Sequence, residues 1–385
     1  MIYEGNCRLG DLFNSRREKG RAGLPTLSVT LNDGLINRED LARKQDTTLT
    51  PEEHLLVKPG DIAYNMMRMW QGALGLASCE GMVSPAYVVL QPKERIDPVF
   101  ASYLFKTERM RYLFWAYSYG LTDDRLRLYF QDFSRIPVTI PPKKEQQKIA
   151  ETLLNWDSTI SVTESLLKAT LVQKRYLAQK LLSGVNSYSA ERMVRFLGGV
   201  AEIIMGSSPE SSCFNSLGLG LPLIQGNADI KDRLSNPKIF TSETTRECFP
   251  GDILLSVRAP VGEVSKSIHH ACIGRGMAAI RPRSGISPSY LYQALLASEG
   301  IWAKLSQGST FDAVTTKDVK KLKLQFPVVE GEQEKIAEVL EVADEQAEKL
   351  SKKLKLLRAE KQSLMRQLLT GKRRVRTPDA DAVEA

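Results

Sequence analysis

Three residues in the second half of the chain could support metal-dependent cleavage of DNA. Asp252 is followed by Glu263 and Lys266, and carboxylates of this kind can hold a divalent cation that activates water. The chain contains an internal repeat, however, in which Leu76 and Cys79 stand where the second copy has Glu263 and Lys266. We therefore favour a turn aspartate followed by a solvated strand, and no catalytic residues.

Three other chemistries lack the residues that they need. The glycines of Leu217-Gly218-Leu219-Gly220 precede Leu221-Pro222, so they do not lead into a helix N-terminus as a nucleotide-binding loop does. The sequence has no Asn/Asp-Pro-Pro-Tyr/Phe tetrapeptide of the adenine methyltransferases. His54 and the pair His269-His270 have no ligand partners at zinc-site spacing. We expect no metal and no cofactor in this chain, which should be unable to bind S-adenosylmethionine or to methylate DNA by itself.

The side chains that do fit a chemistry are polar or planar ones beside predicted turns. In the DNA major groove Arg pairs with guanine and Gln or Asn with adenine, whereas Lys, Ser and Thr mainly hold phosphates. The predicted DNA-binding residues are Arg68, Trp70, Gln71, Tyr87, Arg125, Arg127, Gln225, Asn227, Arg258, Arg275, Gln307, Thr310 and Lys317. The alternative is that Trp70 and Tyr87 belong to the core and that several of the others only solvate loops.

Composition sets broad limits on the class of protein. The chain has 385 residues, 42% of them hydrophobic, which is enough for two or three globular units. A formal net charge of +8 and a pI near 9.1 are compatible with a polyanionic partner. No apolar run can span a bilayer, and the start lacks the features of a signal peptide. Five scattered cysteines without a CxxC pair favour reduced thiols in a cytoplasmic protein.

Two long segments have the spacing of coiled-coil helices, with steps of four and three residues that keep one stripe, the seam, against a partner helix. Residues 143–184 have seam positions Ile149, Leu153, Trp156, Ile160, Thr163, Leu167, Thr170, Lys174, Leu177 and Leu181. Residues 328–371 have Ile336, Leu340, Ala343, Ala347, Leu350, Leu354, Leu357, Lys361, Leu364 and Leu368. Each segment stops at a glycine, the usual residue at a helix end.

The two segments superpose at a constant offset. Lys148 returns as Lys335 (335 − 148 = 187), and Lys174 returns as Lys361 at the same offset. A polar residue in the seam can fix the register of two helices at some cost in stability. Each helix of roughly 40 residues would be about 60 Å long, which suits a spacer better than a core element.

The globular segments repeat as well. Pro59-Gly60-Asp61-Ile62 returns as Pro250-Gly251-Asp252-Ile253, and apolar helical patterns at residues 98–119 and 287–306 correspond to each other. We predict an α+β protein with two similar domains separated by two long antiparallel helices in a pseudo-twofold tandem repeat. Its segments are a first domain (1–142), a central helix (143–184), a second domain (185–327), a distal helix (328–371) and a basic, polar, solvated tail (372–385).

These motifs together resemble the DNA-specificity (S) subunit of type I restriction–modification enzymes over residues 5–371. The residues that carry the resemblance are the two Pro-Gly-Asp-Ile turns, Trp70-Gln71-Gly72, Met205-Gly206-Ser207-Ser208-Pro209, Gln307-Gly308-Ser309-Thr310, and the pairs Glu145-Gln146 and Glu332-Gln333 at the helix starts. The resemblance implies two target-recognition domains, each binding one half of a bipartite asymmetric site on double-stranded DNA. The helices would set the spacing and dock two methyltransferase subunits, which bind S-adenosylmethionine. Restriction subunits would join that host-defence assembly.

Two alternatives to a non-catalytic DNA-specificity subunit remain at this point. The chain could be a coiled-coil scaffold whose two domains bind protein, or a nuclease that uses Asp252, Glu263 and Lys266. Partner docking on the helices is favoured by apolar residues expected to face outward. These residues are Leu154, Leu166, Leu182, Val339 and Leu356.

Overall fold

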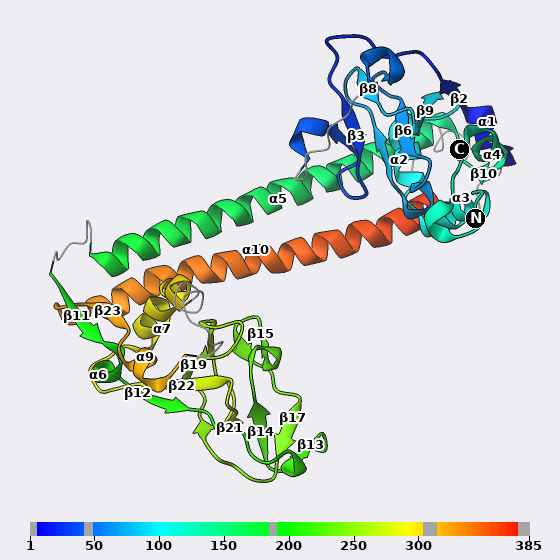
Figure 1. Cartoon of the computed structure of the whole chain (residues 1–385). Helices are drawn as coiled ribbons and strands as arrows, with labels where there is room; N and C mark the ends of the chain where they lie inside the picture. Colours follow the sequence, from blue (N-terminus) through cyan, green and yellow to red (C-terminus); the bar gives the residue numbers. More distant parts are fainter. Residues whose placement is uncertain (1–5, 42–48, 185–190, 303–313, 376–385) are drawn as a thin grey trace, which may run out of the picture. The chain divides into compact units, whose positions relative to one another are not determined.

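The computed structural model describes residues 6–41, 49–184, 191–302 and 314–375 (Figure 1). The chain divides into two compact units, and each is described by itself. Unit 1 comprises Met1–Thr163 with Lys353–Ala385, and unit 2 comprises Glu164–Lys352. None of the helices in the described ranges combines the length and apolarity that a membrane crossing requires.

Unit 1 is built around a four-stranded antiparallel sheet in the order β2-β9-β6-β7, with bounds Phe13–Arg16, Tyr87–Pro92, Ile62–Asn65 and Leu74–Leu76. Three two-stranded pairs accompany it: β1 (Asn6–Arg8) with β10 (Pro137–Thr139), β3 (Leu27–Val29) with β4 (Leu35–Asn37), and β5 (Leu55–Val57) with β8 (Gly81–Val83). The short helices are α1 (Leu9–Leu12), α2 (Pro98–Leu104), α3 (Glu108–Ala116), α4 (Phe130–Arg135), η1 (Arg38–Asp40), η2 (Pro51–Glu53), η3 (Met69–Gln71) and η4 (Asp123–Arg125).

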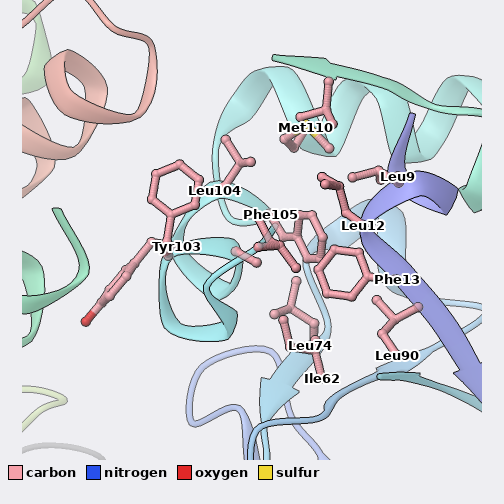
Figure 2. Packing of buried hydrophobic residues seen from close by; sticks show 14 of the residues in the cluster. Leu9, Leu12, Phe13, Ile62, Leu74, Leu90, Tyr103, Leu104, Phe105 and Met110 are labelled. Atoms are coloured by element: carbon pink, nitrogen blue, oxygen red, sulfur yellow. The ribbon is translucent and has the colours of Figure 1, made fainter. Parts of the chain in front are cut away.

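Aromatic and aliphatic side chains from the sheet and the helices form the core of unit 1. Figure 2 shows Phe13 beside Phe105 among Leu12, Leu74 and Leu90. The ring centroids of Phe13 and Phe105 lie 5.7 Å apart. Because all of these side chains are buried, the sheet and the covering helices are held by hydrophobic packing.

Unit 2 contains two larger sheets and one strand pair, β11 (Arg192–Phe196) with β23 (Lys323–Pro327). The six-stranded sheet has the order β12-β22-β19-β20-β16-β15, with bounds Ala201–Met205, Met277–Pro282, Ile253–Ser256, Val264–Lys266, Leu234–Ser235 and Ile230–Lys231. The five-stranded sheet has the order β13-β17-β14-β21-β18, with bounds Phe214–Asn215, Ile239–Thr241, Leu221–Ile224, Ala271–Ile273 and Glu247–Cys248. The short helices are α6 (Leu197–Val200), α7 (Pro288–Ala297), α9 (Thr316–Lys320), η5 (Ser211–Cys213) and η6 (Asn227–Asp229).

The predicted α+β class with two similar domains is confirmed by matching elements in the two units. The central pair β6–β9 of unit 1 corresponds to β19–β22 of unit 2, and both pairs are antiparallel. In each unit a proline-started helix, α2 or α7, follows the longer strand, and a side chain just before it caps the first turn. Asp97 caps α2 and Ser287 caps α7.

The prediction of one continuous helix in each domain, at residues 98–119 and 287–306, is wrong. The pattern at residues 98–119 forms two helices: α2 ends at Leu104, and the Thr107 hydroxyl caps α3 by accepting from the Met110 amide. The helix predicted from residue 287 to 306 is interrupted at Ser298, whose hydroxyl donates to the Ala294 carbonyl. Its last four predicted residues lie outside the described ones.

The long helices are α5 (Lys143–Ser183) and α10 (Glu332–Leu369). Both are followed by a glycine with positive φ, 74° at Gly184 and 71° at Gly371, as the sequence predicts. All twenty predicted seam positions are buried or half-buried. Within unit 1 the helices run antiparallel, since Glu145 pairs with Arg374 and Asp157, further along α5, pairs with Lys361.

The glutamine near the start of each long helix ties the helix to its own domain. Gln146 is fully buried and accepts from the Asp97 amide at 2.8 Å. Its side-chain amide donates to the carbonyls of Arg95 and Pro141 at 3.0 and 2.8 Å. Gln333 makes the equivalent bond in unit 2, accepting from the Ser287 amide at 3.0 Å. The Glu-Gln motif therefore has a structural role at each domain–helix junction.

The tail is partly ordered, which corrects the prediction of a solvated segment after residue 371. The Arg374 guanidinium donates to both carboxylate oxygens of buried Glu145 at 2.7 and 2.6 Å, and Val375 packs on the core of unit 1. Arg192 makes the corresponding contact in unit 2, where it binds Glu332 at 3.0 Å. An arginine in the segment after each long helix thus binds the first turn of the other long helix.

Candidate nucleic-acid interface

Four of the predicted DNA-binding residues line two adjoining hollows in unit 2. The larger hollow has a volume of about 600 Å³ and the smaller about 240 Å³. Gln225 and Arg275 line both, whereas Asn227 and Arg258 line the smaller one. These residues come from the ends of three strands that are distant in sequence, so the fold gathers them in one place.

Hydrogen bonds donated by backbone amides hold these loops together. The Gly274 amide donates to the Ile224 carbonyl at 2.8 Å, and the Arg275 amide donates to the Ser208 hydroxyl at 3.1 Å. The Val257 amide donates to the Gly276 carbonyl at 2.9 Å. A side chain at Gly276 would place its Cβ 2.2 Å from the Gln225 carbonyl oxygen, so the close approach requires glycine here.

The hollows offer both donors and acceptors to a ligand. Gln225, Arg258 and Arg275 are exposed, and within the described ranges neither arginine has an ion-pair partner. Asn227 is half-buried and donates to Glu263. Glu210 adds a carboxylate to the wall of the larger hollow. This mixture suits the edges of base pairs, which present donors and acceptors side by side.

Several lining residues were missed by the sequence analysis. They are Ser207, Ser208, Glu210, Ser211, Ser212, Phe214 and Ser256. The signal that could have found them is the run of small polar residues after Met205, which is used only for the family resemblance in the sequence analysis. The loop lies beside Arg275 because the Ser207 amide donates to the Ile273 carbonyl at 3.0 Å.

In unit 1 the predicted residues after β6 lie on the loop equivalent to the one that carries Arg258. Arg68 and Gln71 are exposed at the two ends of the turn around η3. Trp70 is half-buried, and its indole nitrogen donates to the Met67 carbonyl at 3.1 Å. Tyr87 is also half-buried and packs on a small core cluster, so its environment is closer to the core alternative.

Arg125 and Arg127 are brought next to that loop by a second segment. Both side chains are exposed, and Arg127 and Tyr119 exchange backbone hydrogen bonds of 2.9 Å. The Leu128 amide donates to the Met66 carbonyl at 2.9 Å, which joins this segment to the loop carrying Arg68. Unit 2 has the same link, from the Val314 amide to the Val257 carbonyl at 2.9 Å.

The remaining predicted residues are not brought into either hollow. Lys317 is exposed on α9 and lines neither of them. Gln307 and Thr310 lie outside the described residues.

The residues considered for a nuclease are engaged in structural contacts. Buried Asp252 accepts from the Phe249 amide at 2.8 Å and from two Arg281 nitrogens at 2.9 and 2.8 Å. That hydrogen-bonded pair raises the pKa of Arg281. The Lys266 ammonium lies 4.3 Å from the ring centroid of Tyr292. Within the described ranges, no group of three or more His, Cys, Asp or Glu residues could hold a metal ion.

Comparison with known proteins gives a consistent result. A family model described as a type I restriction modification DNA specificity domain matches residues 6–171 and again residues 190–358. A Methanocaldococcus jannaschii protein described as a type I restriction enzyme MjaX specificity subunit is 27% identical over 390 residues, covering 95% of this chain and 91% of its own length. The MjaIX specificity subunit of that organism is 29% identical over 176 residues, covering 43% of this chain and 40% of its own.

Solved structures share the fold. The S subunit of a type I restriction–modification system from M. genitalium superposes with a TM-score of 0.64 at 18% identity, covering 95% of this chain and 96% of that one. The HsdS subunit of Thermoanaerobacter tengcongensis gives 0.51 at 23% identity, with 95% and 96% covered. A chain from a study of complex assembly and conformational transition of the type I R-M system gives 0.63 at 23% identity, with 96% and 99% covered.

Proposed function

Because the chain belongs to the type I restriction–modification DNA specificity family, we propose that it is the non-catalytic subunit that selects the DNA sequence in such a complex. Each domain recognises one half of a bipartite asymmetric site on double-stranded DNA. The observation that carries the proposal is the pair of hollows in unit 2, where Gln225, Asn227, Arg258 and Arg275 converge.

The chemistry of these side chains fits base recognition. Gln225 and Asn227 can each form two hydrogen bonds with adenine, and Arg258 and Arg275 can do so with guanine. The arginines lack carboxylate partners in the described part of the chain, so their charge is available to DNA. In unit 1 the exposed Arg68, Arg125 and Arg127 lie on two joined loops that serve the same purpose.

The long helices supply the surface for partner subunits. Leu154, Leu166, Val339 and Leu356 are exposed to between 46% and 63%, as expected for residues that a partner would cover. Leu182 was expected to face outward and does not, because it packs on the core of unit 2. The twofold repeat supports two methyltransferase subunits, which bring S-adenosylmethionine and the methyl-transfer chemistry. Restriction subunits join through that assembly.

A selection experiment tests this function. The chain, purified with its methyltransferase partner, would be incubated with a library of random duplex DNA, and the methylated molecules would be sequenced. A bipartite motif with an unspecified spacer is the expected result. Methylation without sequence preference would favour the protein-binding scaffold instead. Magnesium-dependent cutting of DNA by this chain alone would indicate a nuclease.

A further inference from the structure

Each long helix has one aspartate whose two carboxylate oxygens bind different elements. In unit 1, Oδ1 of Asp157 on α5 accepts from the Lys361 ammonium on α10, and Oδ2 accepts from the Tyr103 hydroxyl of α2 at 2.5 Å. A single carboxylate thus connects both long helices to the globular domain.

Unit 2 contains the same arrangement. Oδ1 of Asp344 on α10 accepts from the Lys174 ammonium on α5, and Oδ2 accepts from the Gln293 side-chain amide of α7 at 2.8 Å. The two aspartates are related by the offset of the sequence repeat (344 − 157 = 187), as are the two lysines (361 − 174 = 187). We call these two sets the carboxylate junctions.

The surroundings make the junctions sensitive to the loss of a partner. Both lysine side chains are only 17% exposed, and the Lys361 ammonium lies 5.2 Å from the centroid of the Tyr103 ring. Burial, followed by the hydrogen bond to Asp157, raises the pKa of Tyr103, so the phenol stays protonated and donates. A lysine held in an apolar seam needs its carboxylate, because an unpaired buried charge is costly.

Besides the bonds of Gln146 and Gln333 at the helix starts, apolar packing joins each domain to its helices. Leu153, Leu364 and Leu368 belong to or pack on the core of unit 1, and Leu181 and Leu340 do so in unit 2. Such packing is strong but has little directional preference. Figure 2 shows Tyr103 at the edge of the core with its hydroxyl pointing away from the other labelled side chains. The carboxylate junction adds a directional contact at that edge.

We propose that Asp157 and Asp344 are positioning residues that fix the orientation of each domain on its helix pair. They thereby present the base-contacting loops at one defined place along the DNA. This inference rests on the proposed function, since it explains how a bipartite site comes to have one permitted spacer length. Neither aspartate contacts DNA in this account.

The test uses the full chain with its methyltransferase partner. DNA libraries would hold both half-sites constant and vary the spacer one base pair at a time. Tyr103→Phe removes only the hydrogen bond to the domain and keeps the ring. Lys361→Met removes the bond between Asp157 and α10 together with the contact of the ammonium with the Tyr103 ring. We expect both variants to keep both half-sites while the preference for the wild-type spacer over its neighbours falls about tenfold, which is the effect of losing one charge-assisted hydrogen bond.

Rescue and control variants separate positioning from general stability. The exchange Asp157→Lys with Lys361→Asp keeps the ion pair between the helices and should recover more spacer preference than Asp157→Lys alone. Lys148→Met removes an exposed ion pair of 2.7 Å with Glu151 on the same helix and should change nothing. If the charge-reversed variants fail to fold, the spacer preference of Tyr103→Phe still tests the positioning role.

The outcomes for the two proposals can be told apart. If the wild-type protein is sequence-specific but both Tyr103→Phe and Lys361→Met keep its spacer preference, the positioning role is overturned and the proposed function stands. A wild-type protein without sequence preference would overturn the proposed function. A lower melting temperature with unaltered spacer preference would show a merely structural contact and would also overturn the positioning role.

Discussion

At the scale of single residues, Arg258 offers the clearest test of base recognition. Its side chain is exposed on the loop after β19 and lines the smaller hollow with Gln225 and Asn227. Arg258→Ala should relax selection at one base position and cost about 1–3 kcal/mol there if the contact with guanine is bidentate. Methylation of a panel of sites, each with one base pair substituted, would measure the effect.

The matched control for this change is Arg233→Ala. Arg233 belongs to the same unit, but its guanidinium is paired with Glu299 at 3.0 Å and lines neither hollow. The control should leave base preference unaltered. A uniform loss for Arg258→Ala at every sequence would instead identify Arg258 as a phosphate contact.

The polar residues beside turns were predictable because strand ends and their residue types are visible in the sequence. That these residues lie close together was not predictable, because Gln225, Arg258 and Arg275 meet only through the pairing of strands that are distant along the chain. Ser207 and Ser208 were missed for the same reason, since the run of small polar residues after Met205 indicates a loop but not that Arg275 lies beside it. The turn role favoured for Asp252 is supported by the bond that it accepts from the Phe249 amide, whereas the solvated strand expected after it is wrong, because β19 is buried.

At the scale of elements, the two long helices were predictable because their seam repeats over ten positions and each ends at a glycine. The division of residues 98–119 into two helices was not predictable, since the capping role of Thr107 depends on its local geometry. The ordered Arg374 was also unpredictable, because its partner Glu145 lies 229 residues away in the sequence.

Gln146 provides a test of the domain–helix junction in unit 1. Gln146→Leu should lower the free energy of unfolding by about 1–3 kcal/mol, because the backbone groups of Arg95, Asp97 and Pro141 lose the buried amide that they bind. Urea unfolding of the full chain would measure the loss. Gln147→Leu is the matched control, because Gln147 is the next residue in the sequence and its side chain is exposed. This substitution should change stability little. Equal effects of the two substitutions would argue against the junction.

At the scale of the whole molecule, the sequence repeat predicts that each domain recognises one half-site. Replacing residues 1–142 with the first domain of another family member should change one half of the methylated motif and leave the other half intact. The physical reason is that each unit has its own core and its own candidate base-contacting loops. Sequencing of methylated DNA would show the new motif. Modularity would be refuted by a change in both halves, or in neither.

The last prediction concerns the spacer function of α5 and α10. Lys174 faces Asp344 and Lys361 faces Asp157, so the segment between Thr163 and Leu167 in α5 lies opposite the one between Leu350 and Leu354 in α10. A matched insertion of four residues at these two points should preserve the seam, whereas an insertion in one helix alone should disrupt it and destabilise the protein. Four residues lengthen a helix by about 6 Å, close to two base-pair steps of about 3.4 Å. They also add a rotation of about 40°, since they exceed one turn of 3.6 residues, so some activity should be lost.

We expect the unspecified spacer of the motif to grow by one or two base pairs while both half-sites stay the same. Methylation-sensitive sequencing would measure the spacer. An unchanged length would mean that the domains reach DNA independently of the helices.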